Sequence, residues 1–189
     1  MKKILLALTA FLLFTGCEMQ VVPTEPEGSL AENKIDNYAL ERVIDGDTII
    51  FRGLKKSVRL VGIDTPESKA SLKLIDMANQ CTDGSLSAMK ILGKEASHFV
   101  EGLTQVGRVY EVKSIETGKY GRVIGDITVN GESLSLQIAR EGYATIYPGK
   151  SKISPDLKDR IESAYLDARA NSKGLWGKYP IVMECLNPR

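Results

Sequence analysis

Histidine and cysteine are scarce in this chain of 189 residues, which contains one histidine and three cysteines. A zinc site in a hydrolase takes three or four protein ligands, most of them histidine or cysteine. The single histidine, His98, and the scattered cysteines do not provide that set, so a zinc hydrolase is excluded. His98 lies beside Phe99 in a predicted helix, and a structural or surface role is favoured over a role as general base.

A strong excess of one charge is also absent. The chain has 25 basic and 24 acidic side chains, which gives a formal net charge of +1. Proteins that bind nucleic acid usually have a stronger basic bias than this. Any recognition of phosphate must therefore come from a local cluster of basic side chains.

The apolar run near the amino terminus, Ile4 to Phe14, is too short for a comfortable transmembrane helix. It follows two lysines and ends at small residues before Cys17, which is typical of a secretory signal over residues 1–17. The stretch "FTGC" resembles a bacterial lipobox, whose cysteine is lipidated and becomes the first residue of the mature protein. We expect an exported lipoprotein, anchored to a membrane through Cys17 on the extracytoplasmic side. Phe14 replaces the leucine usual at its position, so a secreted or periplasmic soluble protein stays open as the alternative.

Composition divides the rest of the chain into a tether, one domain and a tail. Residues 18–36 carry prolines and several acids without a sustained period, which is typical of a flexible, solvated tether. Residues 37–178 are long enough for one domain with a real core, and they contain no internal repeat. Residues 179–189 remain as a carboxy-terminal tail.

The hydrophobic pattern of the domain changes from strands to helices along the chain. Short segments with alternating or β-branched apolar residues predict five strands, at 38–44, 46–53, 56–63, 107–114 and 122–129. Helical spacing and capping residues predict helices that begin at Ser85, Ser133 and Ser154. This order indicates an α+β domain dominated by a five-stranded β-barrel, with about three helices.

Two aspartates, Asp45 and Asp47, stand at a strand junction in "IDGDT". Taken alone, Asp-Gly is an ordinary hairpin signal. An EF-hand that starts at Asp45 fails, because Ile50 stands where that loop requires glycine. A hard cation would therefore need oxygen ligands from separate strands, and Asp64 and Glu67 are the obvious partners.

The stretch "RLVGIDTPE" (59–67) places an arginine, two acids and a threonine around the end of a strand. Taken alone, it is also explained as a strand followed by a proline turn. In "TGKYGR" (117–122), Lys119 and Arg122 can hold phosphate, the arginine in a forked geometry. A solvated hairpin tip is the alternative interpretation of this second stretch.

The three stretches occur in this order in a strand-rich domain that ends with "KGLW". Together they resemble the staphylococcal nuclease (thermonuclease) family over residues 38–178. The resemblance implies an OB-fold β-barrel and a calcium-dependent nuclease that acts on DNA, RNA or both. Such an enzyme hydrolyses the phosphodiester bond at the 5′ oxygen and leaves 3′-phosphate ends. We also expect the protein to be monomeric.

The resemblance further implies roles for individual residues. The implied calcium ligands are Asp47, Asp64 and the backbone carbonyl of Thr65, with Asp45 in the outer coordination sphere. The implied catalytic residues are Arg59, Glu67 and Arg122. The implied contacts to a substrate phosphate are Lys119 and Tyr120. Tyr147 is a further candidate for such a contact, in a stretch that is out of register with the active-site tyrosines of the family. In physical terms, calcium and two arginines stabilise the charge of the five-coordinate transition state, while Glu67 positions or deprotonates the attacking water.

The sequence departs from the compact members of that family at residues 68–84, a longer connection that is interpreted as a decorated loop rather than a lid. If Cys17 is lipidated, Cys81 and Cys185 remain, and export places them in an oxidising compartment. We therefore predict a disulfide between the insertion and the tail. The alternative function is a catalytically inactive OB-fold lipoprotein that binds nucleic acid or calcium at the cell surface. All three implied catalytic residues are present, which favours the enzyme.

Overall fold

The computed structural model describes residues 33–187, except for the side chain of Tyr120. The predicted signal, the predicted lipidation site Cys17 and the predicted tether up to residue 32 lie outside the described residues. Within residues 33–187, no helix is both long enough and apolar enough to cross a membrane. The first strand begins at Ile35, slightly before the predicted domain boundary at residue 37.

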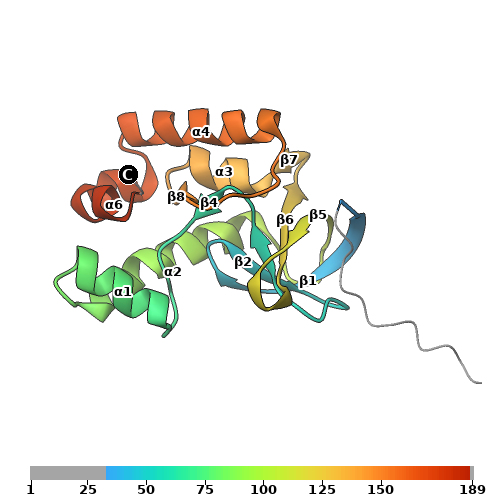
Figure 1. Cartoon of the computed structure of the whole chain (residues 1–189), viewed down its shortest axis with the longest axis horizontal. Coiled ribbons are helices and arrows are strands. Elements are labelled where there is room, and N and C mark those ends of the chain that lie inside the picture. The colour runs from blue at the N-terminus through green and yellow to red at the C-terminus, as the bar shows by residue number, and fades with distance from the viewer. Residues whose placement is uncertain (1–32, 188–189) are drawn as a thin grey trace, which may run out of the picture.

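Five strands form a closed barrel (Figure 1). They are β1 (Ile35–Asp45), β2 (Thr48–Phe51), β3 (Val58–Leu60), β5 (Val109–Thr117) and β6 (Val123–Val129), and the short β7 (Glu132–Ser133) pairs with the end of β6. β1 pairs antiparallel with β2 and with β5, while β2 pairs with β3 and β5 with β6. The parallel pairing of β3 with β6 closes the ring. The predicted α+β class with a five-stranded OB-fold barrel is confirmed.

Side chains that alternate between the core and the surface explain why these segments form strands. In β6, Val123, Ile127 and Val129 are buried, and the residues between them are partly exposed on alternate positions. Leu40 and Phe51 from β1 and β2 belong to the same core. Burying one such side chain stabilises the fold by about 1.5–3 kcal/mol, so this shared core makes the barrel a rigid support for what it carries.

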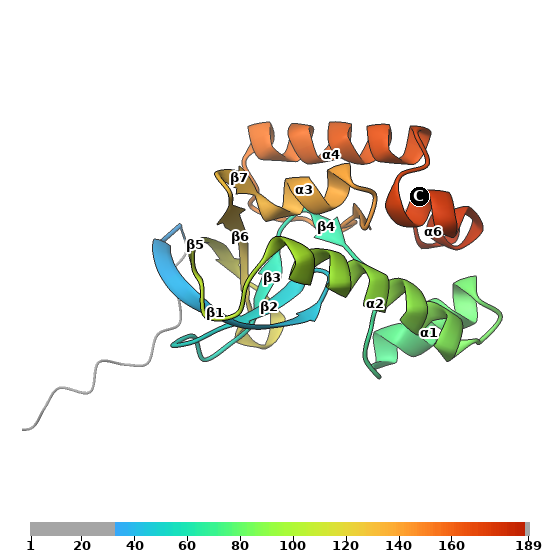
Figure 2. The ribbon, with the colours of Figure 1, turned by 180° about the vertical axis from the view of Figure 1, so that it is seen from behind.

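Three helices lie outside the barrel, and the third of them packs on the second. They are α2 (Leu86–Leu103), α3 (Leu134–Arg140) and α4 (Pro155–Ala170). Each begins after a predicted serine cap, Ser85, Ser133 or Ser154, whose hydroxyl accepts a hydrogen bond from a backbone N–H of the first turn. Figure 2 shows α2 running along the barrel, with α3 and α4 on another side. α2 packs against β1, and α3 packs against α4.

Two short strands outside the barrel, β4 (Ile63–Asp64) and β8 (Thr145–Ile146), pair antiparallel. The pairing continues past β8, because the backbone N–H of Tyr147 donates to the carbonyl of Gly62 at 3.1 Å. The segment after β3 is thereby tied to the loop that leads into α4. As a result, Asp64 and Tyr147 lie at the same end of the barrel.

The number of helices is higher than predicted, since six α-helices lie in the described residues where about three were expected. The additional ones are α1 (Leu72–Cys81), α5 (Gly174–Lys178) and α6 (Pro180–Leu186). α1 lies inside the insertion 68–84, which is interpreted above as a loop, and α6 lies inside the predicted tail 179–189. These helices are short, so tertiary packing rather than intrinsic propensity stabilises them.

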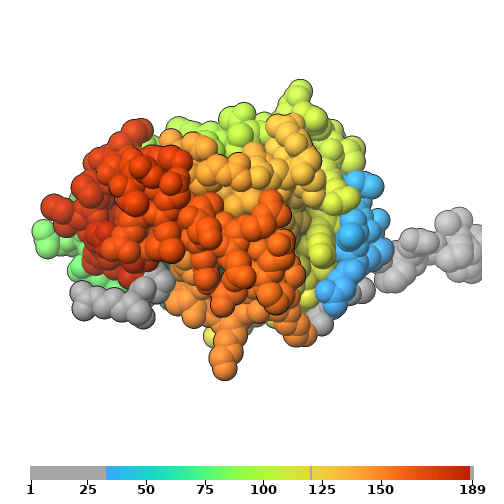
Figure 3. Space-filling view, turned by 90° about the horizontal axis from the view of Figure 1, so that it is seen from above, coloured from blue at the N-terminus to red at the C-terminus, as the bar shows by residue number. Residues whose placement is uncertain are grey.

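α1 and α6 pack against each other and share a small hydrophobic cluster apart from the barrel core. Leu74 and Ala78 of α1 form this cluster with Met89 of α2. Cys81 and Cys185 are joined by a disulfide, with their Cα atoms 5.6 Å apart. In the space-filling view the red carboxy-terminal helices adjoin the green insertion (Figure 3). The insertion is therefore fastened to the end of the chain.

We expect the protein, isolated without reductant, to contain no free thiol at Cys81 or Cys185. The structure pairs them, and their Cα separation lies within the range that a disulfide requires. Alkylation in denaturant should leave both cysteines unmodified, whereas prior reduction should expose both. Mass spectrometry of the alkylated peptides measures this, and free thiols in the unreduced protein would contradict the pairing.

Candidate active site

One end of the barrel gathers the charged residues that the sequence analysis selected. Asp47 lies between β1 and β2, and Arg59 lies on β3, where it is the register partner of Thr48. Asp64 ends β4, and Glu67 follows it closely in the chain. The antiparallel pairing of β2 with β3 is thus what brings Asp47 beside Arg59.

Arg59 joins two carboxylates that come from different strands. Its Nη1 donates to Asp47 Oδ1 at 2.8 Å, and its Nη2 donates to Asp64 Oδ1. Burial would lower the pKa of Arg59, but Asp47 and Asp64 raise it above its ordinary value. Because a planar guanidinium holds two oxygen atoms in a fixed geometry, Arg59 sets the distance between the two carboxylates.

Asp47 is almost fully enclosed, with 2% of its side chain exposed. It accepts hydrogen bonds from the Thr48 hydroxyl at 2.8 Å and from the Thr65 backbone N–H at 3.0 Å. Burial raises the pKa of Asp47, but the positive charges of Arg59 and Lys73 and these hydrogen bonds outweigh burial and hold it below its ordinary value. The carboxylate is therefore ionised at neutral pH.

The donor atoms at this end of the barrel fit a hard divalent cation. Asp47 and Asp64 supply ionisable carboxylates, and Thr65 Oγ1 is buried without a hydrogen-bond partner in the described structure. Calcium prefers such oxygen ligands. Across residues 33–187 no group of three or more His, Cys, Asp or Glu side chains is arranged to hold a metal. Two carboxylates would therefore need to be supplemented by a threonine oxygen and by water.

A lysine that the sequence analysis did not select lies in the middle of this cluster. Lys73, in the first turn of α1, has its Nζ 2.7 Å from Asp64 Oδ1 and 2.8 Å from Glu67 Oε1. Burial lowers the pKa of this lysine, but Asp47, Asp64 and Glu67 raise it above its ordinary value, so the ammonium is charged. The signal that could have located it is the helix cap at Ser71, which begins α1 within the insertion.

Asp45 holds the backbone behind Glu67. Its Oδ1 accepts a hydrogen bond from the Ser68 backbone N–H at 3.1 Å and another from the Ser68 hydroxyl. Asp45 thus fixes the path of the chain after Glu67. Its predicted place in the outer coordination sphere of a cation stays a prediction.

A cleft of 330 Å³ is lined by most of the predicted catalytic and phosphate-binding residues, whereas Asp45, Asp47 and Thr65 do not line it. Its lining includes Arg59, Asp64, Glu67, Lys73, Lys119, Arg122 and Tyr147. Arg122 directly follows the 3₁₀ turn η1 (Lys119–Gly121), and its buried Nε has no hydrogen-bond partner in the described structure. Leaving a buried donor unpaired is costly, and an anion in the cleft would relieve that cost. The side chain of Tyr120 lies outside the described part, so its predicted phosphate contact is not located.

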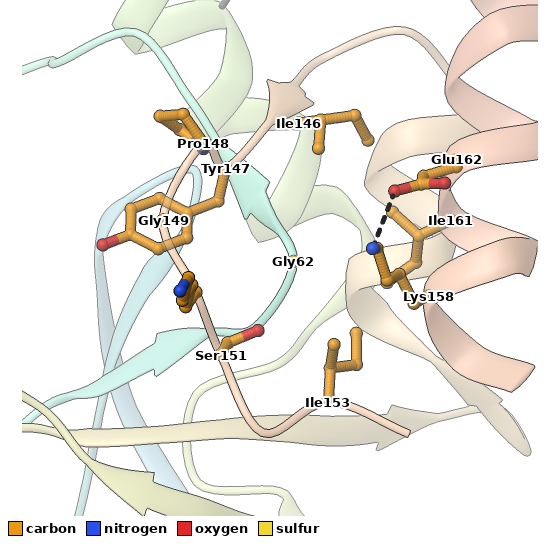
Figure 4. A pocket seen from close by; sticks show the side chains of 11 residues that line it. Gly62, Ile146, Tyr147, Pro148, Gly149, Ser151, Ile153, Lys158, Ile161 and Glu162 are labelled. Atoms are coloured by element: carbon orange, nitrogen blue, oxygen red, sulfur yellow. Dashed lines mark ion pairs between the residues drawn. The ribbon is translucent and has the colours of Figure 1, made fainter. Parts of the chain in front are cut away.

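Tyr147 lines this cleft and also a larger neighbouring pocket of 640 Å³. The Arg59 guanidinium carbon lies 5.5 Å from the centroid of its ring, within the range of a cation–π contact. Figure 4 shows Tyr147 on one side of the larger pocket and the apolar side chains of Ile153 and Ile161 on the other, with the Tyr147 hydroxyl pointing away from them. The charged groups that phosphate chemistry needs line the smaller cleft, so we assign the candidate active site to that cleft.

Gly93 of α2 allows the backbone after Pro66 to approach the helix closely. A Cβ at this position would lie 2.3 Å from the carbonyl carbon and oxygen of Glu67 and 2.5 Å from the nitrogen of Ser68. These are backbone atoms, which cannot turn aside as the end of a flexible side chain can. Gly93 is thus a second positioning residue that the sequence analysis did not select, and an isolated glycine within a helical pattern was its only signal.

The fold and the site together define an α+β protein of the OB-fold class, with a charged cleft at one end of its barrel. Residues 57–178 match the family model described as staphylococcal nuclease homologue. The chain is 31% identical over 146 residues to a thermonuclease of Staphylococcus intermedius, and this alignment covers 75% of the chain and 76% of that protein. The chain belongs to the staphylococcal nuclease homologue family.

Two further relatives come from Bacillus subtilis (strain 168). The chain is 27% identical over 176 residues to endonuclease YhcR, which covers 89% of the chain but only 14% of YhcR. It is 29% identical over 153 residues to endonuclease YncB, which covers 78% of the chain and 64% of YncB. The chain therefore spans a small part of the first protein and just under two thirds of the second.

Proposed function

We propose that this protein is a nuclease that hydrolyses phosphodiester bonds of DNA, RNA or both, with calcium as its cation. The observation that carries the proposal is the convergence of Arg59, Glu67 and Arg122 on one cleft, beside the arginine-linked carboxylates of Asp47 and Asp64. The names of the relatives, thermonuclease and endonuclease, agree with this activity.

The arginines bind the phosphate and stabilise the charge that develops on it. A five-coordinate phosphorus carries more concentrated negative charge than the substrate, and fixed donors in a partly enclosed cleft stabilise that charge strongly. Arg122 offers its unpaired buried Nε–H, and Lys119 adds a positive charge to the lining of the cleft. A calcium ion held by Asp47, Asp64 and a Thr65 oxygen would supply further positive charge beside the phosphate.

Glu67 takes the proton of the attacking water in this proposal. Its carboxylate is held from two sides, by the Ser71 hydroxyl 3.4 Å from Oε2 and by Lys73 2.8 Å from Oε1. Attack at phosphorus breaks the bond to the 5′ oxygen, which leaves and takes up a proton. The products are then a 3′-phosphate end and a 5′-hydroxyl end.

We further propose that the protein acts as a monomer outside the cytoplasm, held to a membrane by a lipid on Cys17. The disulfide between Cys81 and Cys185 supports export, because disulfides form and persist in oxidising compartments. A secreted or periplasmic soluble form remains the alternative to the lipid anchor.

Digestion of a supercoiled plasmid, with calcium and with calcium chelated, tests the proposed activity. We expect nicking and then degradation in calcium, and intact plasmid in the chelator. The Glu67→Gln variant should leave the plasmid intact in both conditions. A catalytically inactive binding protein would instead retard the wild-type mixture in a gel without cutting the plasmid.

Replacing Gly93 with alanine is expected to lower kcat by about tenfold or more, because small displacements of reacting groups are costly. The new Cβ would push the backbone of Glu67 and Ser68 away from α2. Gly102→Ala in the same helix is the matched control, since a Cβ there meets nothing within 4 Å. Steady-state cleavage kinetics and thermal denaturation of both variants measure the effect, and an equal kcat would show that the close approach does not position Glu67.

A further inference from the structure

Lys73 belongs to neither the three motifs nor the strands that carry them. It lies in the insertion 68–84, yet its Nζ contacts Asp64 Oδ1 at 2.7 Å and Glu67 Oε1 at 2.8 Å. Its side chain is 37% exposed, so it is partly enclosed and remains within reach of ions in the cleft. One insertion residue thus contacts both a predicted cation ligand and the predicted base.

The position of Lys73 is built into the fold. The Ser71 hydroxyl caps α1 by accepting a hydrogen bond from the Leu74 backbone N–H at 3.0 Å. Leu74 and Ala78 bury the inner face of the helix, and the disulfide of Cys81 fastens its last residue to α6. The helix is held along its whole length, so its first turn presents the lysine to the site reproducibly.

The charges of the cluster make Lys73 a competitor for a cation. Asp47, Asp64 and Glu67 bring three negative charges, and Arg59 and Lys73 balance two of them. The ammonium already lies against the Oδ1 atom of Asp64. A divalent cation bound to the same carboxylate would lie within a few ångströms of that ammonium, where like charges repel strongly.

We propose that Lys73 is an internal counter-ion of the active site, which competes with the divalent cation for Asp64 and Glu67 and thereby weakens cation binding. The inference rests on the cation site in the proposed function. The insertion then has a role beyond decoration, because it sets the calcium concentration at which the site fills. A site of lowered affinity depends on surroundings that are rich in calcium, such as those outside a cell.

Calorimetric titration of the full mature protein with calcium chloride, without nucleic acid, tests this inference. Lys73→Met removes the charge and retains most of the apolar stem, so its dissociation constant for calcium should fall by about tenfold. Lys73→Arg keeps the charge and should bind calcium about as the wild type does. Lys69→Met is the matched control, because Lys69 is an exposed lysine in the same insertion. The calcium affinity of this variant should equal that of the wild type.

Calcium affinity in Lys73→Met that equals or falls below that of the wild type would overturn the inference, as would a failure of all variants to bind calcium. Thermal denaturation with and without calcium provides a second measurement. The calcium-induced rise in Tm should be larger in Lys73→Met than in Lys69→Met. Plasmid cleavage by the wild type separates the two proposals, since tighter calcium binding in Lys73→Met together with no cleavage by the wild type would support the counter-ion and contradict the nuclease. Unchanged calcium binding in Lys73→Met together with normal cleavage by the wild type would contradict the counter-ion and support the nuclease.

Discussion

Replacing Arg122 with lysine is expected to lower kcat by about a hundredfold or more, the scale seen when one oriented donor is removed from a transition state. Lysine keeps the charge but lacks the planar fork that can hold two phosphate oxygens at once. The calcium dissociation constant should barely change, because Arg122 is not among the candidate ligands. Arg59→Lys should lower kcat on the same scale, and it also removes the link between Asp47 and Asp64.

Single-turnover cleavage of an oligonucleotide, together with calorimetric titration of calcium, measures both quantities for Arg122→Lys. Arg52→Lys is the matched control, because Arg52 is an exposed arginine outside the cleft. A near-normal turnover in Arg122→Lys would show that "TGKYGR" is only a solvated hairpin tip.

Replacing Asp47 with asparagine is expected to abolish nearly all cleavage and to weaken calcium binding by at least about tenfold, because one full negative charge leaves the ligand set. The amide has nearly the same size as the carboxylate, so packing around this enclosed position should persist. Calcium titration and single-turnover cleavage of the same preparation measure the two effects. Normal calcium affinity in Asp47→Asn would remove Asp47 from the ligand set.

Asp47 should also make the fold sensitive to acid in the absence of calcium. Its pKa in the folded protein lies below the ordinary value of 3.8, so the unfolded chain binds the proton more readily. The resulting stability is complete above the ordinary pKa and is lost as pH falls through the lower, folded pKa. Asp47→Asn should therefore lose less stability than the wild type on acidification, whereas Asp159→Asn, at an exposed position, should follow the wild type. Denaturant unfolding as a function of pH measures this difference.

The barrel and most of the candidate site were accessible from sequence because their signals are local. Strand alternation and the serine caps at Ser85, Ser133 and Ser154 predict where the main elements begin. The pairing of neighbouring strands then brings Asp47 next to Arg59, two residues that the resemblance to the nuclease family had assigned to one site. The pairing of Cys81 with Cys185 followed from counting cysteines in a chain that we expect to be exported, and the structure contains that bond.

The residues that were missed act only through tertiary contacts. Lys73 is one lysine among many in the sequence, and its importance arises because α1 folds back onto the site. Gly93 matters because the backbone of Glu67 lies so close to it that a Cβ at this position would clash. α6 is a short helix that is stabilised by packing against α1 and by a disulfide rather than by its intrinsic helix propensity. The hydrophobic periodicity of a sequence does not indicate tertiary contacts of these kinds.

Cleavage of a 5′-labelled single-stranded DNA oligonucleotide, followed by analysis of the product ends, tests the central claim most directly. In calcium, the account predicts shortened products that end in a 3′-phosphate, and it predicts none with calcium chelated or with Glu67→Gln. An oligonucleotide that is bound but stays intact in calcium, or products that end in a 3′-hydroxyl, would contradict the account.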